Sequence, residues 1–266
     1  MSIRLIACDM DGTLLDSRKR HPRDILPVIR ALKEKGVLFA VASGRQYAAL
    51  RRDLEEIAHE ILFICENGAL VMHQEKRLLI DPVDAVDLPD ILHTAKELHN
   101  AYPVVCGAEM AYIGDGAPEQ FLRETLPYYT SCTCVPDLSL RQHDQDVCKV
   151  AFYDMGDAQT GELPLLERAL GDRLAVILSG EHWVDVMKPG VHKGKAMASL
   201  QKMLGISPAE CMAFGDYLND CELLASAGES YAMDNAHPKL KAMARYIAPG
   251  NDEDGVLRVI RERFSL

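Results

Sequence analysis

Short apolar runs alternate with amphipathic stretches along this chain, and this alternation is the feature that most restricts its fold. Residues 3–8 and 37–42 are largely apolar, contain no Gly or Pro, and have the length of buried strands. Between them, residues 24–35 carry apolar side chains at helical spacing, with Pro22 near the start and Gly36 just past the end. A strand, a helix and another strand in succession are typical of a parallel sheet. We therefore predict an α/β fold on a doubly wound parallel sheet.

The alternation is interrupted in the middle of the chain and then resumes. Between about Pro82 and Pro189 the sequence has helical stretches and longer polar connections, which we interpret as a separate α+β layer. The predicted domains are a core of residues 1–81 and 190–266, and an inserted α+β domain of residues 82–189. Further core strands are expected at 61–65, 211–214, 230–233 and 246–248, and core helices at 47–58 and 195–204. Inserted strands are expected at 147–153, 174–178 and 183–187, and inserted helices at 89–98, 119–126 and 162–170.

Charge and hydropathy exclude several classes of partner. The 266 residues carry 29 Lys and Arg against 40 Asp and Glu, a net charge of −11, and no basic stripe offsets it. Such a surface repels a polyanion, so we expect no nucleic-acid partner. No apolar run approaches the roughly 18 residues of a membrane span, and the first residues lack the pattern of a signal peptide. We expect a cytoplasmic protein without a membrane partner, and the sequence leaves the oligomeric state open.

The eight cysteines are scattered through apolar runs, which favours buried thiols over disulfides in a chain of this kind. The set best suited to zinc is Cys132, Cys134, His143 and Cys148. A single residue separates the first two, whereas zinc sites usually place two to four residues between paired cysteines. Buried thiols are therefore the favoured interpretation.

Polar side chains follow three of the predicted strands. Asp9 and Asp11 come after the first strand, Ser43 follows the second, and Asp216 and Asp220 follow the strand at 211–214. Open parallel sheets bind ligands outside the carboxyl ends of their strands, so these side chains should meet in one crevice. The carboxylates would repel one another unless a cation lay among them. A few hard oxygen ligands favour Mg²⁺, which also accepts a phosphate oxygen, so a small phosphorylated metabolite is the expected ligand.

Four ordered motifs resemble those of the haloacid dehalogenase superfamily. They are Asp9-Met10-Asp11-Gly12-Thr13, Ser43-Gly44-Arg45, Lys193-Gly194, and Gly215-Asp216-Tyr217-Leu218-Asn219-Asp220. Other strings resemble the Cof-type sugar-phosphate phosphatases: Glu66-Asn67-Gly68-Ala69, Ala232-Met233 with Asn235-Ala236, and Asp254-Gly255-Val256. A further resemblance, to the bacterial branch that acts on hexose phosphates, is carried by Cys106-Gly107, Ala111-Tyr112, and Ala117-Pro118-Glu119 with Phe121. The resemblance implies a Rossmann-like core with a cap inserted between the second and third motifs, where the α+β domain is predicted.

The resemblance also implies how the first motif works. Asp9 would be the nucleophile that attacks phosphorus to form an aspartyl-phosphate, and it would also bind the metal. Asp11 would protonate the leaving alkoxide and later deprotonate the attacking water, with its backbone carbonyl on the metal. Halide leaves without a proton, and the dehalogenases replace this second Asp. Its presence here favours phosphate chemistry.

The remaining motifs would bind the phosphoryl group and the metal. Ser43 and Lys193 would contact the transferring phosphoryl oxygens, where fixed positive potential matters most. Asp216 would be a metal ligand, and Asp220 would either orient a metal-bound water or hold Lys193. By the resemblance, the other phosphate-binding residues are Gly44, Arg45 and Asn219.

The sequence therefore predicts a Mg²⁺-dependent phosphatase that hydrolyses small phosphomonoesters, with sugar phosphates as the expected substrates. Two alternatives stay open. A sugar phosphomutase would use the same motifs and return the phosphoryl group to a sugar hydroxyl. A phospho-ligand binding module would keep the pocket without turnover.

Overall fold

The computed structural model describes residues 2–266. The larger of its sheets has eight strands. In spatial order its strands are β14 (Tyr246–Ala248), β13 (Glu229–Met233), β12 (Cys211–Gly215), β1 (Leu5–Asp9), β2 (Leu38–Ala42), β3 (Leu62–Cys65), β4 (Leu70–His73) and β5 (Lys76–Ile80). From β14 to β3 every neighbouring pair is parallel, and β4 pairs antiparallel with β3. The order reverses between β1 and β12, as expected of a doubly wound sheet.

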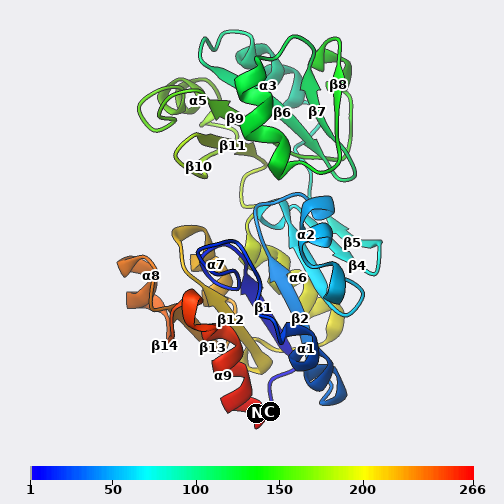
Figure 1. Ribbon diagram of the computed structural model, residues 1–266. Helices are drawn as coiled ribbons and strands as arrows, with labels where there is room; N and C mark the ends of the chain where they lie inside the picture. The colour runs from blue at the N-terminus through cyan, green and yellow to red at the C-terminus, as the bar shows by residue number, and fades with distance from the viewer. Residues whose placement is uncertain (1) are drawn as a thin grey trace. The chain divides into compact units, whose positions relative to one another are not determined.

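Helices cover this sheet and bury its central strands. They are α1 (Ile25–Glu34), α2 (Tyr47–Asp53), α6 (Lys193–Leu204), α7 (Cys221–Ala225), α8 (Pro238–Met243) and α9 (Gly255–Phe264). Helices α1 and α9 pack together, as do α6 and α7, and in Figure 1 α1 and α9 lie in front of the sheet with α6 behind it. Every residue of β1 is buried because both faces of the sheet are covered.

A second sheet lies in the segment between β5 and α6. Its strands are, in spatial order, β10 (Ala175–Leu178), β11 (Trp183–Met187), β9 (Val147–Asp154), β6 (Ala101–Gly107), β7 (Ala111–Gly114) and β8 (Cys132–Val135). The pairs from β10 to β7 are antiparallel, and β7 with β8 is parallel. Helices α3 (Leu88–Ala95), α4 (Glu119–Thr125) and α5 (Leu163–Leu170) complete this layer. Leu88 of α3 and Leu166 of α5 belong to one apolar cluster with strand residues, and Phe121 of α4 belongs to another.

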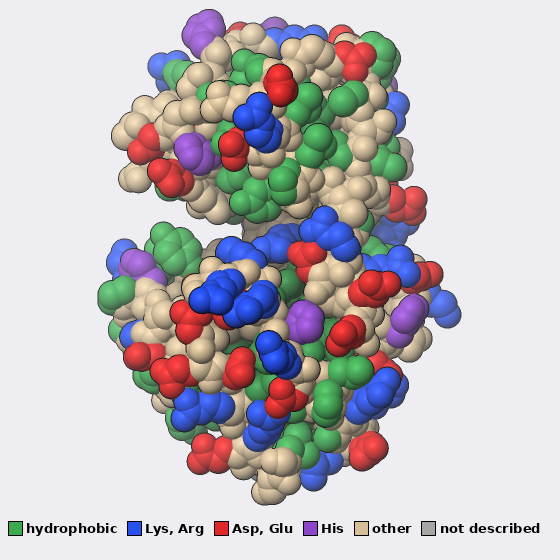
Figure 2. Space-filling model, viewed as in Figure 1, with side chains coloured by type: hydrophobic (Ala, Val, Ile, Leu, Met, Phe, Trp, Pro, Cys, Tyr) green, Lys and Arg blue, Asp and Glu red, His purple; other side chains and the backbone are tan. Residues whose placement is uncertain are grey.

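These sheets belong to two compact units. The first unit comprises the chain up to Gly44, Leu50–Leu79 and His192–Leu266, and the second comprises Arg45–Ala49 and Ile80–Val191. Short 3-10 helices connect several elements, at Glu55–Ile57, Glu66–Gly68, Leu126–Tyr128, Leu138–Arg141, Pro208–Glu210, Leu218–Asp220 and Asn251–Glu253. On the visible face of each unit, acidic and basic side chains are interspersed (Figure 2).

One ion pair is buried inside the second unit. Lys149 Nζ on β9 lies 3.1 Å from Asp185 Oδ2 on the adjacent strand β11, and the two side chains are 6% and 2% exposed. Charges are rarely buried this deeply unless they are paired, because each loses its hydration. Removing either Lys149 or Asp185 should therefore destabilise the second unit.

The predicted α/β fold on a doubly wound parallel sheet is confirmed, with corrections to individual elements. Helix α2 ends at Asp53 rather than at 58, and a 3-10 turn occupies part of the remainder. Strands β5, β6, β7 and β8 and helices α8 and α9 were not predicted. Pro103 lies inside β6, and proline ordinarily counts against a strand. Among the described residues, no helix is both long and apolar enough to cross a bilayer.

Candidate active site

The carboxyl ends of three adjacent strands bring the predicted site residues together. Asp9 is the last residue of β1 and pairs in register with Ala42 of β2, so Ser43 continues the neighbouring strand. On the other side, Cys8 pairs with Phe214 of β12, and Asp216 follows at the end of that strand. Parallel register therefore places these side chains at one edge of the sheet, as the sequence predicted.

Lys193 connects the site to helix α6, whose first residue it is. Its side chain is 1% exposed, and its Nζ donates to Asp9 Oδ1 at 2.6 Å and to Asp220 Oδ1 at 2.7 Å. His192 caps the helix by accepting a hydrogen bond from the backbone N–H of Lys195. The cap fixes the first turn of α6 and with it the base of the Lys193 side chain.

Asp220 uses both of its carboxylate oxygens to organise the site. Oδ1 accepts from Lys193, and Oδ2 accepts from the backbone N–H groups of Asp216 and Tyr217 at 3.2 and 3.3 Å. The residue is completely buried. Of the two roles predicted for it, holding Lys193 is the one for which the structure contains the hydrogen bond.

Asp216 is held from the side of the first motif. Thr13, which is buried, donates its hydroxyl to Asp216 Oδ1 at 3.1 Å. Gly12 lies against the same carboxylate with φ +79°, and a Cβ at this position would overlap Asp216 Oδ2. Only glycine combines this backbone conformation with so close an approach. The Gly-Thr pair of the first motif thus positions the aspartate of the fourth.

The electrostatics of the site favour an additional cation. Burial raises the pKa of Asp9 well above its usual value, and repulsion from Asp220 raises it further. Burial and the charge of Asp220 raise the pKa of Asp216 to about 6. Burial alone would lower the pKa of Lys193, but attraction to Asp220 and Asp9 outweighs this and holds it above the ordinary value. One ammonium therefore serves three carboxylates, which leaves an excess of negative charge.

The carboxylates are spaced as ligands of one ion would be. Asp9, Asp216 and Asp220 each offer an oxygen, and these atoms lie within 4.8 Å of one another. Within residues 2–266 this is the sole group of three or more such side chains, so the cysteine and histidine set considered for zinc is not brought together. Oxygen ligands in this number fit a hard divalent cation.

The structure gives the local surroundings of the other predicted residues. Ser43 is buried, donates its backbone N–H to Ile64 and accepts from the N–H of Asn67. Gly44 lies against the Asn67 side chain, since a Cβ there would be 3.0 Å from Asn67 Oδ1. Arg45 belongs to the second unit, and Asn219 is exposed on the turn before α7. The roles predicted for these residues stay predictions.

Asp11 is engaged outside the carboxylate group. Its Oδ1 accepts a hydrogen bond of 2.6 Å from Lys19 Nζ, and its side chain is 35% exposed. The sequence reasoning missed Lys19, because a lysine in a polar loop carries no signal of its own. Lys19 lies eight residues after Asp11, and only the folded loop brings the two side chains into contact.

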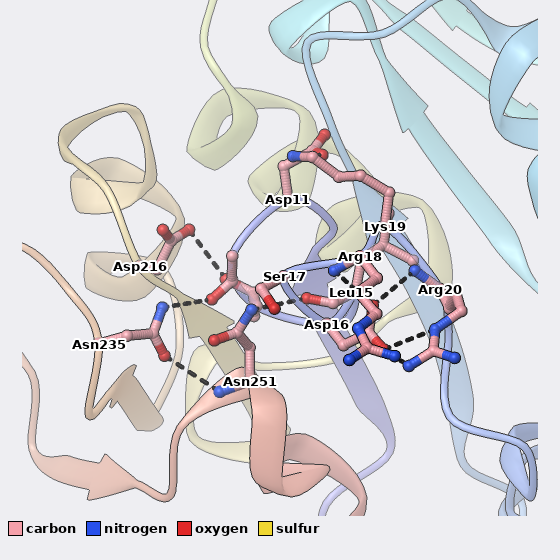
Figure 3. A network of polar contacts seen from close by, with 12 residues as sticks. Asp11, Leu15, Asp16, Ser17, Arg18, Lys19, Arg20, Asp216, Asn235 and Asn251 are labelled. Carbon is pink, nitrogen blue, oxygen red and sulfur yellow. Dashed lines mark hydrogen bonds and ion pairs between the residues drawn. The ribbon is translucent and has the colours of Figure 1, made fainter.

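Two asparagines also hold the first motif and the residues that follow it (Figure 3). Asn235 lies in one of the strings given above, and Asn251 does not. Asn235 Nδ2 donates to the carbonyl of Gly12 at 2.7 Å, and its Oδ1 accepts from the backbone N–H of Asn251. Asn251 Nδ2 in turn donates to the carbonyl of Leu15 at 2.9 Å. Asn235 and Asn251 therefore support the loop that follows Asp9. For Asn235 the family resemblance of its string was the available signal, whereas Asn251 lies outside the string Asp254-Gly255-Val256.

Comparison with known proteins agrees with this geometry. Residues 6–260 match the family of haloacid dehalogenase-like hydrolases. The chain is 33% identical to 5-amino-6-(5-phospho-D-ribitylamino)uracil phosphatase YbjI of Escherichia coli K12, covering 98% of this chain and 96% of that protein. It is 30% identical to the HMP-PP phosphatase of Klebsiella pneumoniae strain 342, covering 90% and 87%.

A solved structure supports the same conclusion. A protein from Streptococcus mutans UA159 superposes with a TM-score of 0.88 at 30% identity, covering 100% of both chains. The family match spans the segments that carry Asp9, Lys193 and Asp216. The chain therefore belongs to the haloacid dehalogenase-like hydrolases and is a phosphatase of that family.

Proposed function

We propose that this protein is a Mg²⁺-dependent phosphatase that hydrolyses small phosphomonoesters through an aspartyl-phosphate on Asp9. The observation that carries the proposal is the buried contact of Lys193 with Asp9 and Asp220, beside Asp216. A fixed ammonium next to a carboxylate at the end of a strand is suited to hold a phosphoryl group while that carboxylate attacks it. Family membership implies a divalent metal, and the three carboxylates offer oxygen ligands for one.

The reaction would proceed in two halves. An oxygen of Asp9 attacks phosphorus, the bond between phosphorus and the ester oxygen breaks, and Asp11 gives its proton to the departing alkoxide. Asp11 then takes a proton from a water molecule that attacks the aspartyl-phosphate. Inorganic phosphate leaves, and the carboxylate of Asp9 is regenerated. Asp9, Asp216 and Asp220 would hold Mg²⁺, which would supply positive charge to offset the carboxylates and the phosphate.

The chain's own residues would orient the phosphoryl group. In the proposal, Lys193 and Ser43 bind its oxygens, with Gly44, Arg45 and Asn219 as further donors. Asp220 keeps Lys193 in place and Thr13 keeps Asp216 in place, by the hydrogen bonds described above. These contacts are made within the protein itself, so little reorganisation is needed during the reaction.

A sugar phosphate or a sugar-alcohol phosphate is the proposed substrate class. The Escherichia coli relative is named for a compound that carries a phospho-ribityl group, a sugar-alcohol phosphate. The Klebsiella relative is named for HMP-PP, so relatives at similar identity differ in substrate. This variety supports a small phosphorylated metabolite and makes the choice of sugar an experimental question.

The experiment is a panel of sugar and sugar-alcohol phosphates assayed with Mg²⁺ and with a chelator. We expect release of inorganic phosphate that requires the metal, and kcat/KM ranks the substrates. Product analysis tests the two alternatives. An isomeric sugar phosphate without free phosphate would identify a mutase, and tight binding without any turnover would identify a binding module.

A further inference from the structure

A loop after the first motif directs a lysine at the proposed acid and base. Lys19 Nζ lies 2.6 Å from Asp11 Oδ1, and in Figure 3 the two side chains point toward each other. The Lys19 side chain is 63% exposed, so packing does not fix its conformation. Its direction is therefore set by the backbone from which it projects.

That backbone forms a closed turn organised by Asp16. The carboxylate of Asp16 accepts from the backbone N–H groups of Arg18 and Arg20, both at 2.9 Å, and from the Arg20 guanidinium at 2.7 and 2.9 Å. The backbone N–H of Asp16 donates to the carbonyl of Arg20, and that of Lys19 donates to the carbonyl of Asp16. Two backbone bonds and one carboxylate thus fix the five-residue turn.

Lys19 itself adopts a left-handed backbone conformation, with φ +61°. For a residue other than glycine this costs about 1 kcal/mol or more, and it persists only where surrounding contacts impose it. Here the Asp16 turn imposes it. The conformation sets the direction in which the Lys19 side chain leaves the chain.

The turn is also anchored from the far end of the chain. Asp252 accepts from the backbone N–H of Ser17 at 2.7 Å, and Asn251 holds the carbonyl of Leu15 (Figure 3). The segment that leads into Lys19 is therefore held by two residues that are distant in the sequence. A surface lysine without a role has no need of such support.

We propose that Lys19 is a positioning residue that holds the Asp11 carboxylate toward the leaving group. The inference rests on the proposed function, in which Asp11 passes a proton to the departing alkoxide. Exposed ion pairs add little to folding stability, about 0–1 kcal/mol, so the contact is not explained as a structural brace. Proton transfer, in contrast, depends strongly on where the carboxyl oxygen lies.

The test compares two esters in the variant Lys19→Met. One is the sugar or sugar-alcohol phosphate that the panel ranks highest, whose alcohol needs a proton to leave. The other is 4-nitrophenyl phosphate, whose phenolate leaves without one. Because kcat/KM reports steps only up to the first irreversible one, it isolates the transfer to Asp9. We expect a loss of about 10-fold for the sugar ester and less than about twofold for the nitrophenyl ester.

Two further variants complete the design. Lys19→Arg keeps a cation and should recover most of the loss on the sugar ester. Arg18→Met removes the same charge one residue away while it keeps Lys19 and its hydrogen bond to Asp11, and should leave both esters unaffected. Thermal unfolding of all the variants should match that of the wild type.

The outcomes separate this inference from the function on which it rests. Equal losses on both esters in Lys19→Met, or no loss on either, would overturn the positioning role while leaving the phosphatase intact. A wild-type protein that hydrolyses neither ester with Mg²⁺ would overturn the proposed function and the inference together.

Discussion

The ammonium of Lys193 lies 2.6 Å from the carboxylate of Asp9, although the two residues are 184 positions apart in the sequence. Both side chains are buried, at 1% and 9% exposure. The contact joins the end of strand β1 to the start of helix α6. The proposed nucleophile is therefore buried, and a lysine that is distant in the sequence helps to orient it.

The variant Asp9→Asn should lose at least about 1,000-fold in kcat, because an amide cannot form the aspartyl-phosphate. Its stability should equal or exceed that of the wild type, since burial and Asp220 already disfavour the charged form of Asp9. Steady-state assays and thermal unfolding measure the two effects. Full activity in this variant would rule out Asp9 as the nucleophile.

The variant Lys193→Met should reduce the free energy of unfolding by about 3–5 kcal/mol, because it leaves two carboxylates buried without their cation. Lys202→Met, on the exposed side of the same helix, is the matched control and should change it by less than about 0.5 kcal/mol. Urea unfolding compares them. Similar midpoints for both variants would contradict the importance of the buried contact.

Gly12→Ala and Gly36→Ala form another matched pair. Both glycines have φ above +70°, so the backbone strain of alanine is similar, but only at Gly12 would the new Cβ overlap Asp216. At Gly36 there is nothing within 4 Å. We expect Gly12→Ala to weaken Mg²⁺ binding and to lose about 10-fold or more in kcat/KM, while Gly36→Ala keeps wild-type activity. Calorimetric titration with Mg²⁺ and initial rates would check this.

Removing the metal should destabilise the protein. If Mg²⁺ binds among the carboxylates, a concentration of 100 times its Kd should add about 2.7 kcal/mol of stability. Asp216→Asn should abolish most of that gain, because it removes one of the three oxygen ligands. The measurement is the unfolding temperature with Mg²⁺ and with chelator. A gain that is equally large in Asp216→Asn would locate the ion elsewhere.

The second unit offers a test that does not involve the active site. Lys149→Met should cost about 3–5 kcal/mol because it leaves Asp185 charged and buried. Replacing both residues, Lys149→Met with Asp185→Leu, should cost much less, since no unpaired charge remains. A double-mutant cycle of unfolding free energies measures the coupling. Additive costs would show that the two side chains do not depend on each other.

Sequence reasoning predicted the core well because its strands are buried on both faces. An unbroken apolar run such as that of β1 is typical of a buried strand. The polar residues that follow such runs, Asp9, Ser43 and Asp216, were therefore predicted to lie at the carboxyl ends of strands. The second unit was harder to predict. Strand β8 has only exposed and half-buried residues and no buried face, and β6 contains Pro103.

Within the site, the individual residues were easier to predict than their partners. The spacing of the carboxylates predicted a shared centre, but it left open whether Asp220 serves the metal or Lys193. That choice depends on where helix α6 begins, and the structure starts it at Lys193 itself. The contacts of Lys19 with Asp11 and of Asn251 with Leu15 exist only in the folded loop, and no local sequence pattern indicates them.

The hydrogen bond from Asn251 to Leu15 has a consequence for how the protein is made. A ribosome adds Asn251 at a point 236 residues after Leu15, long after the segment that carries the nucleophile has emerged. The loop that contains Leu15 cannot form this contact until Asn251 has been synthesised, as in other chains with contacts between distant positions. We therefore expect a nascent chain stalled before Asn251 to have no phosphatase activity, because the loop after Asp9 still lacks this support.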